Sequence, residues 1–147
     1  MLLLRLTTFV KLQKAEVLWS SRFKQNMPSD NNSKSFLTAK KFLGKEVEIV
    51  FDRPLGSKHP KFGFVYEVNY GYLEGVRAPD GEDLDAYYLG THQVLQKARG
   101  VVRAIIHRLD DDDDKLVVTP ENVLMTDDQI KQAINFQERW FKYQIIR

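Results

Sequence analysis

The central feature of this sequence is the stretch at residues 66–90, which reads YEVNYGYLEGVRAPDGEDLDAYYLG. It holds four carboxylates within six positions, between two runs rich in apolar and aromatic residues: Asp80, Glu82, Asp83 and Asp85. Carboxylates this close together repel one another and raise one another's pKa unless a cation lies between them. The stretch therefore has two interpretations, a binding site for a hard metal ion or a solvated acidic turn between two strands.

Length and composition are typical of a single globular domain. The chain has 147 residues, of which 43% are hydrophobic and 29% are charged, enough apolar material for one core. It contains no cysteine, which excludes disulfides, a zinc–thiolate site and a cysteine nucleophile. We expect a cytoplasmic protein.

The first 35 residues differ from the rest of the chain. They hold six basic and two acidic side chains out of totals of 22 and 20, which leaves 16 basic and 18 acidic groups for residues 36–147. The net charge of +2 therefore does not indicate a nucleic-acid partner. The apolar start is interrupted by Arg5 and Lys11 and is shorter than the about 20 apolar residues that span a membrane. We expect residues 1–35 to be a disordered extension, with a targeting segment as the alternative, and residues 36–147 to be the folded domain.

Short strands separated by Gly and Pro turns make up most of that domain. A capping box from Thr126 to Gln129 predicts the start of a helix, with Ile130 on its buried face and Glu138 and Arg139 on its exposed side. Alternating or continuous apolar runs predict strands at residues 45–51, 62–72, 86–89, 101–108 and 115–118. Together they predict an α+β, mainly β fold: a small, mainly antiparallel barrel or sandwich closed by a C-terminal helix.

A second acidic group consists of five aspartates at residues 110–114, between two of the predicted strands. Strands this close in sequence form a hairpin, so we expect the aspartates at its loop tip. As a solvated loop they would have no further role. If they meet the first acidic group, the carboxylate oxygens suit Mg²⁺, with Mn²⁺ as the alternative. Such ions bridge phosphates and activate water, and nearby side chains would bind the phosphates: Arg53, Lys58, Lys61, Lys115, Lys142, Tyr66 and Tyr70.

Three parts of the sequence resemble the soluble family I inorganic pyrophosphatases. Asn69 to Tyr72, followed by Asp80 to Asp85, resembles the signature of that family. The aspartate run with Lys115 after it resembles the family's second aspartate pair and lysine, and residues 136–142 resemble its late helix. The resemblance covers roughly residues 43–142 and implies an OB-like barrel with a C-terminal helix. It also implies Mg²⁺-dependent hydrolysis of pyrophosphate to two orthophosphates, and a possible homo-oligomer.

The same resemblance implies roles for individual residues. The metal ligands would be Asp80 and Asp85, with Asp110 and Asp113 as a second pair. The catalytic group would be Glu82, Tyr70 and Lys115, with Glu82 at the position where the family has an aspartate that helps to activate water. The substrate-binding residues would be Arg53, Lys58, Tyr66 and Lys142. The chain departs from the family in two places. Glu82 is one methylene longer than the family's aspartate, and the segment at residues 52–64 is shorter than the hairpin that the family has there.

Two other functions are compatible with the sequence. A non-catalytic barrel would bind phosphate-bearing ligands such as a nucleotide or RNA through Arg53, Lys58, Lys61 and the tyrosines. A related hydrolase would act on an organic diphosphate.

Overall fold

The computed structural model describes residues 33–77 and 83–147. Within this part, six strands form one sheet in the order β1-β2-β3-β5-β4-β6, and a further pairing of β1 with β4 closes the first five into a barrel. The strands are β1 Glu46–Arg53, β2 Asn69–Arg77, β3 Asp83–Tyr88, β4 Lys97–Arg108, β5 Lys115–Thr119 and β6 Tyr143–Ile146. The predicted class, a mainly β barrel with a C-terminal helix, is confirmed.

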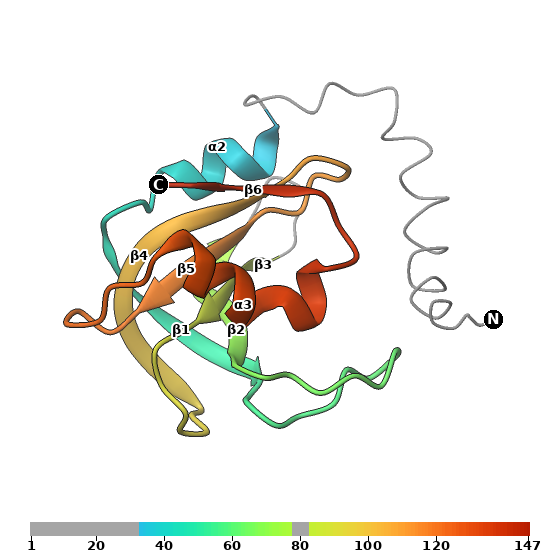
Figure 1. Ribbon diagram of the computed structural model, residues 1–147. Coiled ribbons are helices and arrows are strands. Elements are labelled where there is room, and N and C mark those ends of the chain that lie inside the picture. The colour runs from blue at the N-terminus through green and yellow to red at the C-terminus, as the bar shows by residue number, and fades with distance from the viewer. Residues whose placement is uncertain (1–32, 78–82) are drawn as a thin grey trace.

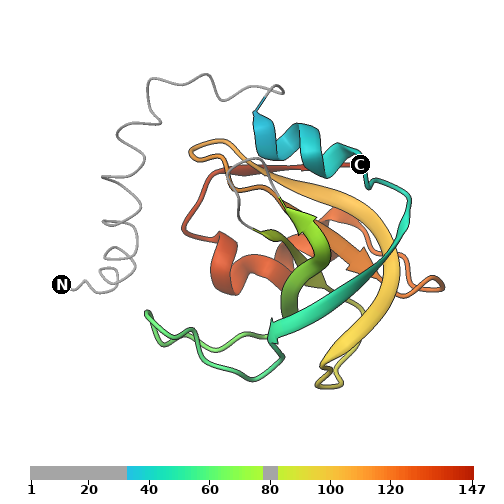
Figure 2. The same cartoon turned by 180° about the vertical axis from the view of Figure 1, so that it is seen from behind.

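The barrel is mixed and not purely antiparallel. β3 and β5 run parallel, with Ala86 opposite Leu116, whereas the other strand pairs are antiparallel. The parallel pair arises because β4 pairs first with β1 and then with β5, and so brings β5 back along the free side of β3. Figure 2 shows β1 and the long, curved β4 forming the wall opposite the C-terminal helix.

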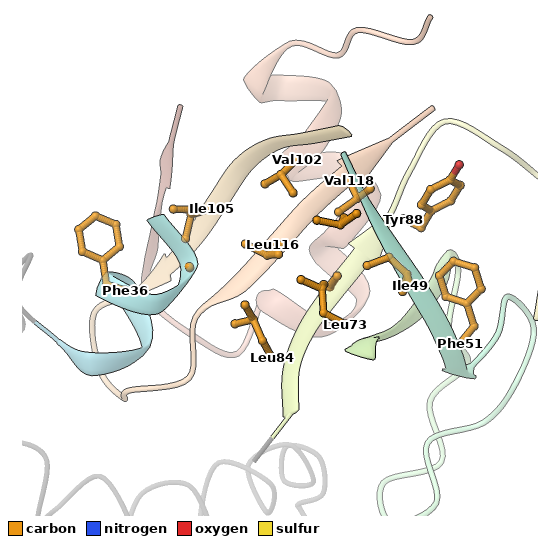
Figure 3. Close-up of a cluster of buried hydrophobic side chains, with 13 residues drawn as sticks. Phe36, Ile49, Phe51, Leu73, Leu84, Tyr88, Val102, Ile105, Leu116 and Val118 are labelled. Atoms are coloured by element: carbon orange, nitrogen blue, oxygen red, sulfur yellow. The ribbon is translucent and has the colours of Figure 1, made fainter. Parts of the chain in front are cut away.

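The barrel interior holds the first hydrophobic core. Alternation along the strands points one face of each inward, and Figure 3 shows the inward side chains in contact across the barrel. The fully or almost fully buried members include Ile49, Leu73, Leu84, Val102, Ile105, Leu116 and Val118. Helix α2, Lys34–Lys40, adds Phe36 and Ala39 to this core.

A second core lies between the outer face of the barrel and helix α3, Asp127–Glu138. Figure 1 shows α3 in front of the barrel, over β2, β3 and β5. The capping box is present as predicted, because Gln129 N donates to Thr126 Oγ1 and Thr126 N donates to Gln129 Oε1. Ile130 and Ile134 of α3 are fully buried against the aromatic side chains of the strands. The packing of this second core fixes the position of α3, and so places the polar side chains at the end of the helix next to the barrel.

Three local predictions differ from the structure. Helix α2 was not predicted, and Lys34 and Ser35, its first residues, lie within the expected disordered extension. β6 was also not predicted. The strand expected at residues 62–72 begins only at Asn69, because the preceding residues form a loop with a single bridge between Lys58 and Val65. Over the described residues, no helix is both long enough and apolar enough to cross a membrane.

Candidate functional site

Polar side chains meet at one end of the barrel, on the face that α3 covers. Four adjacent strands supply one side chain each: Tyr70 from β2, Asp85 from β3, Lys115 from β5 and Arg108 from β4. The end of α3 adds Glu138, and the β4–β5 loop adds Asp113. They gather because the pleat points these strand positions to the same face as the apolar residues that pack on α3.

Asp85 is at the centre of the first half of the site. The hydroxyl of Tyr70 donates to Asp85 Oδ2 at 2.9 Å, and Lys115 Nζ lies 3.4 Å from the same oxygen. Lys115 Nζ is also 2.9 Å from Asp113 Oδ1. One ammonium group therefore joins Asp85 of the first acidic group to Asp113 of the second.

Burial and charge fix the protonation of these partners. Burial by itself would lower the pKa of Lys115, but Asp113 and Asp85 outweigh it and hold that pKa above its usual value. Burial, followed by the charge of Asp85, raises the pKa of Tyr70 well above the ordinary tyrosine value. Near neutral pH, Lys115 is therefore a cation and Tyr70 a neutral hydrogen-bond donor.

The second half of the site is an ion pair between Arg108 and Glu138. The guanidinium donates through Nε to Glu138 Oε1 at 3.0 Å and through Nη2 to Oε2 at 2.7 Å. Tyr87 donates its hydroxyl hydrogen to the same carboxylate, and Gln137 Nε2 donates to the Tyr87 oxygen at 2.7 Å. The expectation that Glu138 is exposed is wrong, because this side chain is fully buried against Arg108.

Each aspartate of the run contacts another residue of the protein. Arg108 Nη1 lies 3.4 Å from Oδ2 of both Asp111 and Asp113. The other three accept hydrogen bonds from other parts of the chain: Asp110 from the backbone N–H of Lys142, Asp112 from that of Ser35, and Asp114 from that of Arg108. The run is at the tip of the β4–β5 hairpin as predicted, and its carboxylates are bonded within the protein although the Asp113 side chain is still 54% exposed.

Asp114 is the most buried part of this run. Its Oδ2 lies 2.8 Å from His107 Nδ1, and the backbone N–H of Asp114 donates to Ser35 Oγ at 3.1 Å. Burial raises the pKa of Asp114 to about 6, although His107 opposes the shift. These contacts join helix α2 to the acidic loop.

The basic side chains predicted to bind phosphate lie in different surroundings. Arg53 is partly exposed and close enough to Tyr66 to lower the pKa of its hydroxyl, although burial dominates and raises that pKa to about 12. Lys58 is exposed in the loop that follows β1. Lys142 is also exposed, and its backbone N–H donates to Asp110 Oδ2. Tyr66 is close enough to both Arg53 and Lys115 for their charges to affect its pKa, and the pKa of Asp52 is affected by both Arg53 and Asp85.

The structure thus brings together four of the predicted site residues: Tyr70, Asp85, Asp113 and Lys115. Asp80 and Glu82 lie outside the described residues. The chemical roles of all these side chains remain predictions.

Sequence reasoning missed three charged residues at this site. Arg108 and Glu138 are the buried ion pair, and Asp52 lies on β1, where burial and then the charges of Asp85 and Asp83 raise its pKa against the opposing effect of Arg53. The helical spacing did contain a signal for Glu138, since it lies four residues after Ile134 on the buried stripe. No local pattern predicts that Arg108 would be its partner.

Of the carboxylates at the site, Asp85 has surroundings that suit a divalent ion and Asp113 does not. Asp85 is about one-third exposed and its contacts with Tyr70 and Lys115 both use Oδ2, so this carboxylate has the surroundings that suit a hard cation. Asp113 instead faces both Arg108 and Lys115. Among the described residues, no three His, Asp or Glu side chains are grouped as a metal ion requires.

Comparisons with known proteins show what this fold is similar to. No protein-family model matches the sequence, and the curated proteins give no significant match. Among solved structures, the inorganic pyrophosphatase of Ehrlichia chaffeensis is similar with a TM-score of 0.53 and 15% identity, over 69% of this chain and 85% of that one. The inorganic pyrophosphatase of Helicobacter pylori is similar with a TM-score of 0.54 and 13% identity, over 69% of this chain and 84% of that one. The inorganic pyrophosphatase of Neisseria gonorrhoeae is similar with a TM-score of 0.50 and 18% identity, over 77% of each chain. At these identities the likeness is one of fold.

Proposed function

We propose that this protein hydrolyses inorganic pyrophosphate to two orthophosphates with the help of Mg²⁺. The observation that carries the proposal is the meeting of Asp85, Tyr70, Lys115 and Asp113 at one end of the barrel. The likeness in fold to three bacterial inorganic pyrophosphatases supports it. A site that combines carboxylates with permanent cations suits a small, highly charged phosphate substrate.

We assign Asp80 and Asp85 as the residues that hold Mg²⁺, because oxygen ligands suit this ion and Mn²⁺. The bound ion would neutralise phosphate charge and lower the pKa of a bound water. Glu82 lies between these two ligands in the sequence, and we propose that its carboxylate accepts the proton of the attacking water.

The remaining side chains would bind the substrate. Lys115 keeps its proton because Asp113 and Asp85 hold its pKa high, so it offers a positive charge to a phosphate oxygen at any pH near neutral. Tyr70 and Tyr66 stay protonated, because burial raises both pKa values. Tyr66 could donate a hydrogen bond to a phosphate oxygen, whereas the one hydroxyl hydrogen of Tyr70 goes to Asp85 and would orient that carboxylate. Arg53, about one-third exposed beside Tyr66, is well placed to bind a phosphate that arrives from solvent.

The outer basic residues complete the proposed substrate site. We place Lys58 and Lys142 at its rim, because both are exposed and an ammonium group on a flexible stem can reach a phosphate. Their contribution would be to attract the anion, and it should weaken at high salt.

Orthophosphate release from pyrophosphate in the presence of Mg²⁺ tests this function. We expect turnover by the wild-type chain and a loss on the order of 100-fold in Asp85→Asn, since this change removes a charged ligand from the site. Asp128→Asn, an exposed carboxylate at the start of α3, is the matched control and should keep full activity. A wild-type chain that releases no orthophosphate, or an Asp85→Asn chain as active as wild type, would contradict the proposal.

A second candidate function is binding of a phosphate-bearing ligand without turnover. It is favoured by the way Arg108 and Lys115 already compensate Asp113, Asp85 and Glu138 within the protein. Calorimetry with pyrophosphate in excess chelator separates the two. Metal-independent, salt-sensitive binding with no orthophosphate released would favour the binding protein.

A further inference from the structure

We infer that Arg108 is a built-in cation of the acidic β4–β5 loop, so that Asp110 and Asp113 do not form a site for a divalent ion. The inference deepens the proposed function, on which it rests for the ion held by Asp80 and Asp85. The site would then take one ion fewer than the sequence implies. A protein side chain would supply the missing positive charge.

The anchor of Arg108 is the first step of the argument. Glu138 holds the guanidinium by two hydrogen bonds, of 3.0 and 2.7 Å, and its central carbon lies 3.6 Å from the centre of the Phe141 ring. Its side chain is 5% exposed. A bidentate contact in a buried position fixes both the place and the direction of the group.

The charge of Arg108 is the second step. A guanidinium keeps its proton in proteins, and the Glu138 carboxylate lies 2.7 Å from Nη2 of this one. Arg108 is therefore a permanent positive charge beside the acidic loop.

The direction of this charge is the third step. Nη1, on the side away from Glu138, lies 3.4 Å from carboxylate oxygens of both Asp111 and Asp113. Lys115 Nζ approaches Asp113 from the other side at 2.9 Å. An ion bound by Asp113 would lie beside two buried cations and would be repelled by both.

The other expected ligand, Asp110, points to a different part of the chain. Its Oδ2 accepts a hydrogen bond from the backbone of Lys142 at 3.4 Å, whereas Asp113 faces Arg108 and Lys115. Mg²⁺ requires several oxygen ligands in near-octahedral positions, and two aspartates held in different contacts do not supply them.

The direct test counts bound Mn²⁺ by electron paramagnetic resonance of the free ion, on the full chain without pyrophosphate. The informative variant is Arg108→Gln with Glu138→Gln, because removing only one partner leaves a buried, unpaired charge and risks unfolding. We expect this double variant to bind one more Mn²⁺ than wild type, since Oδ2 of Asp111 and Oδ2 of Asp113 both lose Arg108, while Lys115 keeps only its contact with Asp113 Oδ1.

Two controls complete the test. Arg99→Gln with Glu46→Gln removes an exposed ion pair of 3.2 Å elsewhere on the barrel with the same change in charge, and should leave the count unchanged. Asp113→Asn in the otherwise wild-type chain should also leave it unchanged. The inference is overturned if Asp113→Asn loses an ion, or if the folded double variant binds no more Mn²⁺ than wild type. Absence of pyrophosphate turnover would overturn the proposed function but would not alter these counts.

Discussion

A methyl group on Gly71 would lie 1.9 Å from the carbonyl oxygen of Val50. Gly71 is the glycine between the two tyrosines of the central stretch, and the backbone of β1, which pairs with β2, passes so close to it that no side chain fits. At this point the register between the two strands shifts, and Arg53 then pairs with Tyr70. The glycine thus helps to place Arg53 near the site.

We predict that Gly71→Ala prevents stable closure of the barrel. The clash is with backbone atoms that cannot rotate away, so we expect a loss of about 3 kcal/mol or more in the free energy of unfolding. Gly44→Ala is the matched control. Its added methyl group would meet nothing within 4 Å, and its positive φ of 79° should cost only about 1–2 kcal/mol. Urea denaturation followed by circular dichroism measures both, and equal losses would contradict the role of close approach.

The hydroxyl of Tyr70 carries the second prediction. Tyr70→Phe removes the 2.9 Å hydrogen bond to Asp85 and should cost about 1.5–3 kcal/mol of stability, the usual range for a bond to a charged group. Orthophosphate release should fall, because Asp85 loses a contact that orients it. Tyr88→Phe, which removes a hydrogen bond to the backbone of Arg99, should reduce stability without reducing turnover per folded molecule. The proposed role of Tyr70 fails if both variants keep wild-type turnover.

The Arg108–Glu138 pair should show strong energetic coupling. Either single change to Gln leaves a buried charge without its partner, which costs roughly 3–5 kcal/mol. The double change removes both charges and should cost less than the sum of the two single changes. A double-mutant cycle by chemical denaturation tests this, and strict additivity would show that the two side chains do not stabilise one another.

His59 gives a prediction for the dependence on pH. Its Nδ1 accepts hydrogen bonds from the backbone N–H groups of Lys61 and Phe62, at 3.0 and 3.1 Å, and can do so only when unprotonated. Burial, followed by the charges of Arg53 and Lys61, lowers the pKa of His59 from 6.5 to about 4. Between pH 6.5 and about 4, His59 is protonated in the unfolded chain but not in the folded chain. Stability should therefore fall as the pH falls from about 6.5 towards 4.

Nuclear magnetic resonance of the His59 ring protons against pH measures this pKa directly. His59→Gln keeps an acceptor and removes the titration, so part of the loss of stability at acidic pH should disappear in that variant. A ring that titrates near its ordinary value would contradict the prediction.

The barrel shows which predictions local patterns can make. Apolar runs correctly indicated β1, β4 and β5. β1 alternates because the pleat turns one face of it to the core, whereas β5 is buried at every position and reads as a continuous apolar run. The capping box correctly placed the start of α3, since Thr126 and Gln129 bond within one turn. Each of these features depends on residues close together in the sequence.

Other features depend on which distant segments meet. The parallel pairing of β3 with β5 depends on β4, which pairs with β1 along its first part and with β5 along its later part. No local sequence pattern predicts these pairings. β6 is four residues long and is a strand only because the end of β4 is there to pair with it.

The candidate site divides in the same way. The sequence by itself determined the two acidic groups, the lysine after the second and the tyrosine spacing before the first, because residue type and local strand pattern suffice for these. Only the tertiary structure decided that Lys115 joins Asp85 to Asp113 and that Arg108 faces the acidic loop with Glu138 behind it. Thirty positions separate Arg108 from Glu138. Their ion pair exists because α3 packs on the outer face of the barrel and removes both charges from water, where each then requires the other.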